Sequence, residues 1–513
     1  MSYYGAVDIG SNSVRMQAAE VMIGEPPRII AEDRQVTRLG ASVFLEGVIS
    51  TEAMQQTCEV LARMAQTLEK AKVIGTRAVA TSAVRDARNQ EEFLEQARRA
   101  LGGPVEVISG QEEARLIHLG VQSRWPHPNE NILIIDIGGG SVEIIQSRAG
   151  EMTAGYSKPL GAVRLTEVFL RHDPPTSLEL RQLDDYILEK LGPAIREVAD
   201  GLHDRTIATA ATAAAVVCAV RKVPRSKRDS VDRLKASRSQ LNELYEVLSK
   251  SDLEQRRKMN GIGPRRAELI IAGSAVLKRF LESVRQSALY YSAAGVRDGI
   301  IADLHLRGVG LEAGRLDREQ LRAARATAER YGVPVKHADK VAAMASALFE
   351  SLHPLHRLPL PTGRLLQAAA YLHDVGHFIS DTRHHKHSYY VVVHSDLPGF
   401  TERERLMIAN LCRYHRKAMP NPNHDNYKLL TPEEQSQLTG MIPLLRLADS
   451  LDLGREQRVE NVRVRMESGK VELELVSSGD VELEEWAARR VDSVFQEVYG
   501  CSLAVRSSSR ENA

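Results

Sequence analysis

The sequence predicts two related α/β lobes in the N-terminal half of the chain, followed by an all-helical domain and a small α+β cap. The main observation is a duplicated turn, Asp8-Ile9-Gly10-Ser11-Asn12-Ser13 and Asp136-Ile137-Gly138-Gly139-Gly140-Ser141. Each copy follows an apolar strand and precedes a second strand-like stretch. The second observation is that twelve of the sixteen histidines lie between His305 and His424. The C-terminal part therefore has a chemistry of its own.

The residue types in both turns suit a phosphate group and a cation. The acid at the strand end, Asp8 or Asp136, can hold a hydrated divalent cation. The small residues after it let backbone N–H groups approach phosphate oxygens closely. A single copy could be an ordinary hairpin, whereas two copies indicate two lobes that close on a phosphate chain. The copies differ seven residues after the aspartate, where one has Arg15 and the other Glu143.

Length and composition limit the classes of protein that need to be considered. A chain of 513 residues is too long for one core. A net charge of +1 means that an anionic partner would be held by local basic patches. The four scattered cysteines predict neither a disulfide framework nor a zinc ribbon. The longest apolar stretch, Ile207 to Val220, is too short for a membrane span, and no leader precedes the first strand, so we expect a cytoplasmic protein.

The order of the elements predicts four domains. Lobe I, residues 1–125, has strands followed by helices, and a break rich in proline ends it. Lobe II, residues 126–303, repeats this pattern. Residues 304–460 read as helix after helix, with a loop around His384 to His387 and a helix capped by Thr401 and Glu404. Residues 461–513 are expected to form a β-β-α-β cap.

Six motifs in the first 303 residues resemble one known family. In order they are VDIGSNSVR, GTRAVATSAVRDARN, ISGQEEARL, IDIGGGSVE, GAVRLTE and SAAGVRDGI. They resemble the exopolyphosphatase / guanosine pentaphosphate phosphohydrolase family, within the actin-like, sugar-kinase and chaperone ATPase superfamily. The resemblance implies two ribonuclease-H-like (actin-like) lobes with a cleft between them.

The resemblance also implies roles for individual residues. Glu113 would be the base that activates water, and Arg85 would grip the phosphate. The expected Mg²⁺ ligands in the cleft are Asp8, Asp136 and Glu143. The expected phosphate contacts are Gly10, Ser11, Asn12, Ser13, Gly138, Gly139, Gly140, Ser141 and Arg164.

The chemistry of these residues agrees with the implied roles. Hydrolysis of a phosphoanhydride needs a carboxylate to orient or deprotonate water and cations to hold the transferred phosphoryl group. Apart from the resemblance, Glu113 could simply complement the dipole of its helix. Arg85 could likewise be a surface arginine.

The C-terminal histidines resemble a second group, the HD metal-dependent phosphohydrolase superfamily, which is all-helical. The pattern is carried by His337, His373-Asp374 and Asp449. Imidazoles and carboxylates from separate helices can converge on one divalent ion. The resemblance implies a metal site of His337, His373, Asp374, His387, His415 and Asp449. Mn²⁺, Fe, Co²⁺ or Ni²⁺ would suit these ligands. Five further histidines of this region are expected to be structural or exposed: His353, His356, His377, His394 and His424.

The expected function is an exopolyphosphatase that uses Mg²⁺ in the cleft. Its substrate would be inorganic polyphosphate or the 5′ γ-phosphate of guanosine pentaphosphate. Three alternatives stay open: a phosphotransferase, a non-catalytic sensor of polyphosphate or alarmones, and an enzyme whose main activity is in the HD-type domain. The stretch from Gly261 to Glu268 resembles a DNA-binding turn, but we do not expect nucleic acid as a partner. The resemblance suggests a homodimer.

Overall fold

The chain forms two units, Met1–Gly308 and Val309–Ala513. The structure is a computed structural model, and it describes residues 2–22, 25, 27–199, 203–309, 316–467 and 469–509. Within these ranges, none of the helices combines the length and the apolarity needed to cross a membrane.

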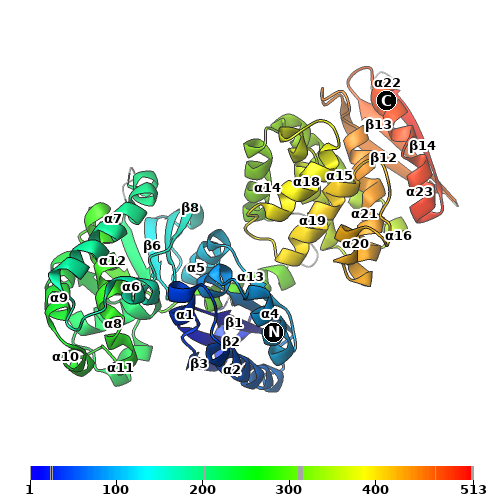
Figure 1. The fold of residues 1–513 in the computed structure, drawn as a ribbon. Helices are drawn as coiled ribbons and strands as arrows, with labels where there is room; N and C mark the ends of the chain where they lie inside the picture. The colour runs from blue at the N-terminus through cyan, green and yellow to red at the C-terminus, as the bar shows by residue number, and fades with distance from the viewer. Residues whose placement is uncertain are drawn as a thin grey trace. The chain divides into compact units, whose positions relative to one another are not determined.

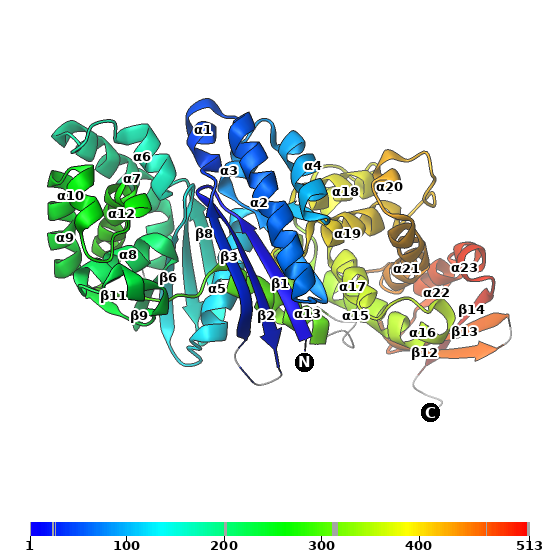
Figure 2. The same ribbon diagram turned by 90° about the horizontal axis from the view of Figure 1, so that it is seen from below.

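Lobe I contains a five-stranded sheet in the order β3-β2-β1-β4-β5. The first three strands are antiparallel, and β4 and β5 continue the sheet in parallel with β1. The strands are β1 Ser2–Ile9, β2 Ser13–Val21, β3 Arg28–Val36, β4 Gly75–Ala80 and β5 Val105–Val107. The helices are α1 Leu39–Glu46, α2 Thr51–Lys70, α3 Ser82–Asp86, α4 Gln90–Leu101 and α5 Gly110–Arg124. Figure 2 shows α2 and α4 beside the strands of this sheet.

Lobe II repeats this arrangement around a six-stranded sheet in the order β10-β11-β9-β6-β7-β8. Strands β6 to β8 form the antiparallel part, and β9 runs parallel to β6. The strands are β6 Asn131–Ile137, β7 Val142–Arg148, β8 Glu151–Lys158, β9 Arg205–Thr209, β10 Lys235–Ser237 and β11 Ala288–Tyr291. The helical elements are α6 Ala162–Phe169, α7 Ser177–Val198, α8 Ala210–Val220, η1 Arg225–Ser230, α9 Arg238–Lys250, α10 Leu253–Lys258, α11 Pro264–Ala267 and α12 Ile270–Ser283. The predicted pair of α/β lobes is confirmed.

Helix α5 lies between the two sheets (Figure 1). Its Leu116 packs into the core under the lobe I sheet, while Ala114 and Ile117 pack against the lobe II sheet. Helix α13, Val296–Val309, crosses α5 so closely that a Cβ at Gly299 would lie 1.7 Å from the Leu116 carbonyl oxygen. The first turn of α5, capped by Ser109, is thereby fixed between the lobes.

The second unit combines a helical core with a small sheet. Its helical elements are α14 Arg318–Arg330, α15 Val335–Ser351, α16 His353–His356, α17 Thr362–Leu372, η3 Val375–Phe378, α18 His384–His394, α19 Glu402–Tyr414, α20 Asp425–Lys428 and α21 Pro432–Ser450. The cap contains β12 Val459–Glu467, β13 Lys470–Ser477, α22 Glu482–Arg489, α23 Asp492–Tyr499 and β14 Ser502–Ser509. The predicted helical C-terminal part is confirmed.

Two local expectations for this unit were wrong. Residues 384–387, expected in a loop, begin helix α18, because its buried side chains pack against η3 and α19; these are His384, His385, Ser388, Val391 and Val392. The cap has two short helices where one was expected, so its order is β-β-α-α-β. The chain between Arg490 and Val491 interrupts the helix, and Val491 turns into the core of the unit.

Candidate functional site

The two glycine turns meet in one cavity of about 520 Å³ in the first unit. A Cβ at Gly139 would lie 2.9 Å from the Cβ of Ser11, so the turns touch each other across the lobes. The turns have the same internal hydrogen bond, from Gly10 N–H to the Ser13 carbonyl and from Gly138 N–H to the Ser141 carbonyl. The predicted residues that line the cavity are Asp8, Gly10, Ser11, Asn12, Ser13, Glu113, Asp136, Gly138, Gly139, Gly140 and Ser141.

The strand register places a charged partner opposite each of the two aspartates. In lobe I, Arg15 on β2 is paired with Asp8 on β1. In lobe II, Glu143 on β7 is paired with Asp136 on β6, and Glu143 is fully buried. Burial and the neighbouring charge of Asp136 raise the pKa of Glu143 to about 7, and burial raises the pKa of Asp136 to about 6. Two like charges directly opposite each other destabilise a sheet. This pair therefore suits a bound cation.

The pKa of Glu143 predicts how stability depends on pH when no divalent cation is present. The pKa of Glu143 in the folded state lies above the ordinary value of 4.5. Below pH 4.5 the carboxyl is therefore neutral, and its contribution to the free energy of unfolding is complete. This contribution, of the order of 3 kcal/mol, is lost as the pH rises through about 7. In EDTA, we expect Glu143→Gln to unfold at a higher urea concentration than wild type at pH 8 and at the same one at pH 4.5. An equal difference at both pH values would contradict this expectation.

Glu113, on the first turn of α5, faces the cavity with an unsatisfied carboxylate oxygen. Its Oε2 is buried and accepts no hydrogen bond from the described residues. The nearest cation is Arg85, whose Nη1 is 3.5 Å from this oxygen. Burial, and then the charge of Glu143, raises the pKa of Glu113 well above its ordinary value. A carboxylate with these surroundings is suited to take a proton near neutral pH.

The neighbouring Glu112 has the opposite environment. Its carboxylate accepts hydrogen bonds from Arg115 at 2.8 Å and from Arg77 at 3.0 Å. Burial would raise the pKa of Glu112, but the two arginines hold it below the ordinary value. Asp303 on α13 bonds both arginines as well. This buried network fixes the first turn of α5 and leaves Glu113 as the carboxylate that faces the cavity.

The two arginines expected to bind phosphate differ in how many contacts they make with other residues of the protein. Arg85 donates from Nη1 to the Ile108 carbonyl at 2.7 Å, and its side chain is partly exposed. Arg164 donates to the Gly140 carbonyl and pairs with Asp86 of lobe I. The Arg164 guanidinium also stacks on a phenylalanine ring of α1, with 4.0 Å between the guanidinium carbon and the ring centroid. Arg164 thus links the lobes, and a phosphate role for it stays a prediction that would require these contacts to break.

The cavity also contains five arginines that the sequence analysis did not assign to the site. They are Arg15, Arg34, Arg124, Arg266 and Arg297. Burial, and then the positive charge of Arg15, lowers the pKa of Arg297, so two cations share one enclosed region. Arg297 lies in the quoted motif SAAGVRDGI, which was a usable signal. These side chains place five cations in the cavity beside its carboxylates, a local distribution that the net charge of the chain does not reveal.

Groups of three metal-ligating atoms within 4.8 Å of one another occur, within the described ranges, only in the second unit. Asp8, Asp136 and Glu143 do not form such a group. Mg²⁺ is commonly held by one or two carboxylates together with substrate phosphates, so this spacing still suits it.

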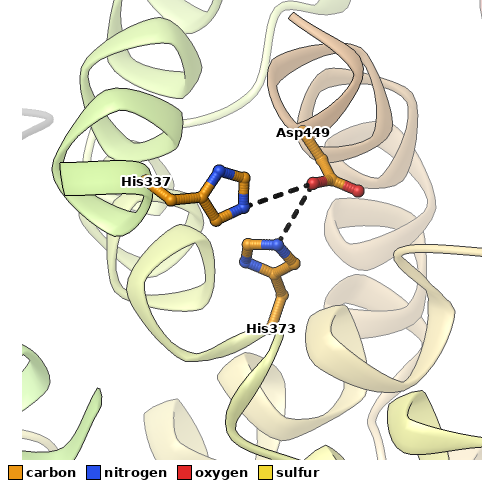
Figure 3. Close-up of side chains that lie close together, drawn as sticks. All are labelled: His337, His373 and Asp449. Carbon is orange, nitrogen blue, oxygen red and sulfur yellow. Dashed lines mark ion pairs between the residues drawn. The ribbon is translucent and has the colours of Figure 1, made fainter. Parts of the chain in front are cut away.

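The first of these groups contains His337, His373 and Asp449, from three separate elements (Figure 3). The distances to Asp449 Oδ1 are 3.8 Å from His337 Nε2 and 3.3 Å from His373 Nε2. Both Nε2 atoms are buried without a hydrogen bond to the described residues. Burial would lower the pKa of His373, but Asp374 and Asp449 raise it to about 9.

The outer contacts orient these imidazoles. His337 Nδ1 lies 2.8 Å from Asp452 Oδ2, which places its proton there and directs the Nε2 lone pair at Asp449. A lone pair that faces carboxylate oxygens in this way suits a metal ion or a proton between them. A carboxylate behind a ligating histidine is the usual second partner at metal sites. Asp452 was not predicted, although it lies only three residues after Asp449 in the sequence.

The second group contains Asp374, His377 and His384. The Asp374 Oδ1 atom is 3.4 Å from His377 Nε2 and 3.7 Å from His384 Nε2. Close packing of η3 on α18 brings them together, since a Cβ at Gly376 would lie 2.1 Å from the His384 carbonyl oxygen. His377, expected to be structural or exposed, is therefore part of the cluster.

The two histidines expected to complete this centre lie outside both groups. His415 Nε2 is 3.2 Å from His384 Nε2, and its Nδ1 bonds the Cys412 carbonyl. His387 is half-buried and belongs to neither group within the described part of the chain. Their roles as ligands stay predictions.

Comparison with known proteins agrees with this architecture of two α/β lobes. The model of the Ppx/GppA phosphatase family matches residues 17–307, and a model described as Ppx/GppA phosphatase, domain III, matches residues 320–488. A guanosine-5′-triphosphate,3′-diphosphate pyrophosphatase from Vibrio campbellii is 27% identical over 466 residues, which are 89% of this chain and 88% of the relative. Its counterpart from Vibrio vulnificus is 26% identical over 477 residues, which are 92% of this chain and 91% of the relative.

Two solved structures extend the comparison to the fold. The PPX-GPPA enzyme of Aquifex aeolicus is 29% identical, with a TM-score of 0.52, covering 59% of this chain and 99% of that one. An exopolyphosphatase from Cytophaga hutchinsonii is 25% identical, with a TM-score of 0.55, covering 60% of this chain and 98% of that one. The first unit therefore has the actin-like two-lobed fold of such phosphohydrolases. The chain belongs to the Ppx/GppA phosphatase family, and the predicted phosphoanhydride hydrolase is confirmed at the level of the family.

Proposed function

We propose that the cleft of the first unit hydrolyses the terminal phosphoanhydride bond of a phosphate chain, with Glu113 as the base. The observation that carries this proposal is the buried, unsatisfied carboxylate oxygen of Glu113, 3.5 Å from Arg85. The carboxylate lies in one cavity with both glycine turns. Its raised pKa suits a group that accepts a proton near neutral pH.

In this mechanism water attacks the terminal phosphorus while Glu113 takes one of its protons. The P–O bond to the rest of the chain breaks, and the shortened chain leaves with a negative charge on its oxygen. Backbone N–H groups of the turns at Gly10–Ser13 and Gly138–Ser141 hold the phosphate oxygens, and Arg85 offsets the charge on the phosphoryl group. Asp8, Asp136 and Glu143 would hold Mg²⁺, which supplies further positive charge when bound.

Guanosine pentaphosphate is the substrate that the relatives' names support, and inorganic polyphosphate is the second candidate. Both are polyanions, and the five arginines of the cavity suit either. A phosphotransferase would need an acceptor in place of water, and a sensor would not need a base. The position of Glu113 favours hydrolysis over both.

Phosphate release by the purified chain tests this function. We expect Mg²⁺-dependent release of inorganic phosphate from guanosine pentaphosphate, from long-chain polyphosphate, or from both. Transfer of the phosphate to a nucleoside diphosphate would instead establish a phosphotransferase. Tight binding of both polyanions without release would establish the sensor.

We also propose that the second unit is an HD-type domain with a divalent metal centre. The observation that favours this is the pair of buried Nε2 atoms of His337 and His373, both directed at Asp449. Asp374 would join this group to His377 and His384. The ion, when bound, would supply an activated water for attack on a phosphate ester. The division into residues 1–125, 126–303, 304–460 and 461–513 belongs to the same proposal, as does a homodimer.

A further inference from the structure

Arg455 lies at the edge of the proposed metal centre and contacts one of its carboxylates. Its Nη2 donates to Asp374 Oδ2 at 2.7 Å. The other oxygen of this carboxylate faces His377 and His384. A metal shared by the two histidine groups would need both oxygens of Asp374. Arg455 and a bound metal ion would therefore both interact with the negative charge of Asp374.

The loop that carries Arg455 is built around the residue that orients His337. Arg455 N–H donates to the Asp452 carbonyl, and Gln457 N–H donates to Asp452 Oδ1. Asp452 in turn bonds His337 Nδ1. The loop and the centre thus form one structure, so the position of Arg455 at the centre is fixed by the same contacts.

The guanidinium of Arg455 has capacity for a second ligand. Its side chain is 45% exposed, and the pair with Asp374 is its one ion pair to a described residue. A guanidinium has five N–H donors in a planar fork that matches phosphate oxygens. The remaining donors can therefore bind an oxyanion next to the metal.

A second arginine lies at the histidine side of the centre. Arg416 Nη1 is 3.3 Å from His384 Nδ1, and the residue is exposed. Within the described ranges it has no carboxylate partner. The two arginines come from segments far apart in the sequence and both contact members of the group formed by Asp374, His377 and His384.

We propose that Arg455 and Arg416 form the phosphate-binding part of this centre and select a phosphate dianion. The inference rests on the metal centre proposed above. With one divalent ion at each of the two groups, the ions and the two arginines carry six positive charges, against three negative charges on Asp374, Asp449 and Asp452. A phosphomonoester or inorganic phosphate dianion offsets two of the three excess positive charges, whereas a phosphodiester monoanion offsets one.

Calorimetric titration of the full chain, loaded with Mn²⁺, tests the proposal with inorganic phosphate and dimethyl phosphate as probes. His373→Ala serves as the reference for Mn²⁺ and phosphate bound elsewhere in the chain. We expect the additional phosphate binding of wild type to weaken tenfold or more in Arg455→Ala and less in Arg455→Lys. Mn²⁺ affinity should rise severalfold in Arg455→Ala, because a cation that competes for Asp374 is removed. Dimethyl phosphate should not bind this site.

The matched control is Arg458→Ala, which removes one positive charge from the same loop. Arg458 pairs with Glu456 and donates to the Asp480 carbonyl, away from the centre. We expect Arg458→Ala to change neither the Mn²⁺ affinity nor the phosphate affinity. Unchanged phosphate affinity in Arg455→Ala would overturn the proposal. A loss of both Mn²⁺ and phosphate binding would also overturn it, because it would indicate that Arg455 only stabilises the loop. Wild type that binds no more Mn²⁺ than His373→Ala would overturn the metal centre itself.

Discussion

Replacing Glu113 with glutamine is expected to lower kcat for phosphate release by roughly 10²–10⁴-fold, the range that a general base typically contributes. Glutamine has almost the same shape, but it cannot accept the proton of the attacking water. Substrate binding should remain, because the two glycine turns and the arginines of the cavity are unchanged. Initial rates of phosphate release and the KM for the same substrate measure both parts of this expectation.

The pH profile separates catalysis by Glu113 from a purely structural role. Since the pKa of Glu113 is raised, the acid limb of kcat/KM for wild type should lie well above pH 4.5. The residual activity of Glu113→Gln should lack this limb. Glu92→Gln, at an exposed position on the first turn of α4, is the matched control and should leave kcat and the profile unchanged. A Glu113→Gln enzyme with near wild-type kcat would refute the role of Glu113.

Local patterns were sufficient to predict the lobes and the two turns. Each turn combines an apolar strand with small residues at fixed spacing, and this chemistry is contained in a few consecutive residues such as Asp136–Ser141. The strand register then follows from the turn, so Asp8 and Arg15 face each other much as Asp136 and Glu143 do. The position of Glu113 depended on the family resemblance, because a glutamate on a first helical turn is common.

The remaining parts of the sites depend on contacts between distant segments. The role of Glu112 is set by Arg77 and by Asp303, which come from other elements and are far apart in the sequence. His377 and His384 become neighbours only because Gly376 lets η3 approach α18. Asp452 and Arg455 join the centre through a loop whose conformation no local pattern reveals. Spacing along the chain favoured His387, whereas packing selected His384.

The largest effect in the second unit is expected for His373→Ala, which should abolish one equivalent of bound Mn²⁺. His373 is fully buried, and its Nε2 has no hydrogen bond to a described residue that could replace the ion. Asp449→Ala, at a more exposed position, should have the same effect with less disturbance of the core. Asp452→Asn keeps every proposed ligand but alters the partner of His337 Nδ1, and we expect it to weaken binding by about 10–100-fold.

Metal content after dialysis, together with calorimetric titration, measures this series on the full chain. His394→Ala is the control, because His394 is an exposed histidine at the end of α18. It should bind as much Mn²⁺ as wild type. The graded order, with complete loss for His373 and Asp449 and partial loss for Asp452, distinguishes a metal centre from a buried proton-sharing cluster. In such a cluster the histidines and aspartates would hold protons, and none of the three changes would alter the bound Mn²⁺.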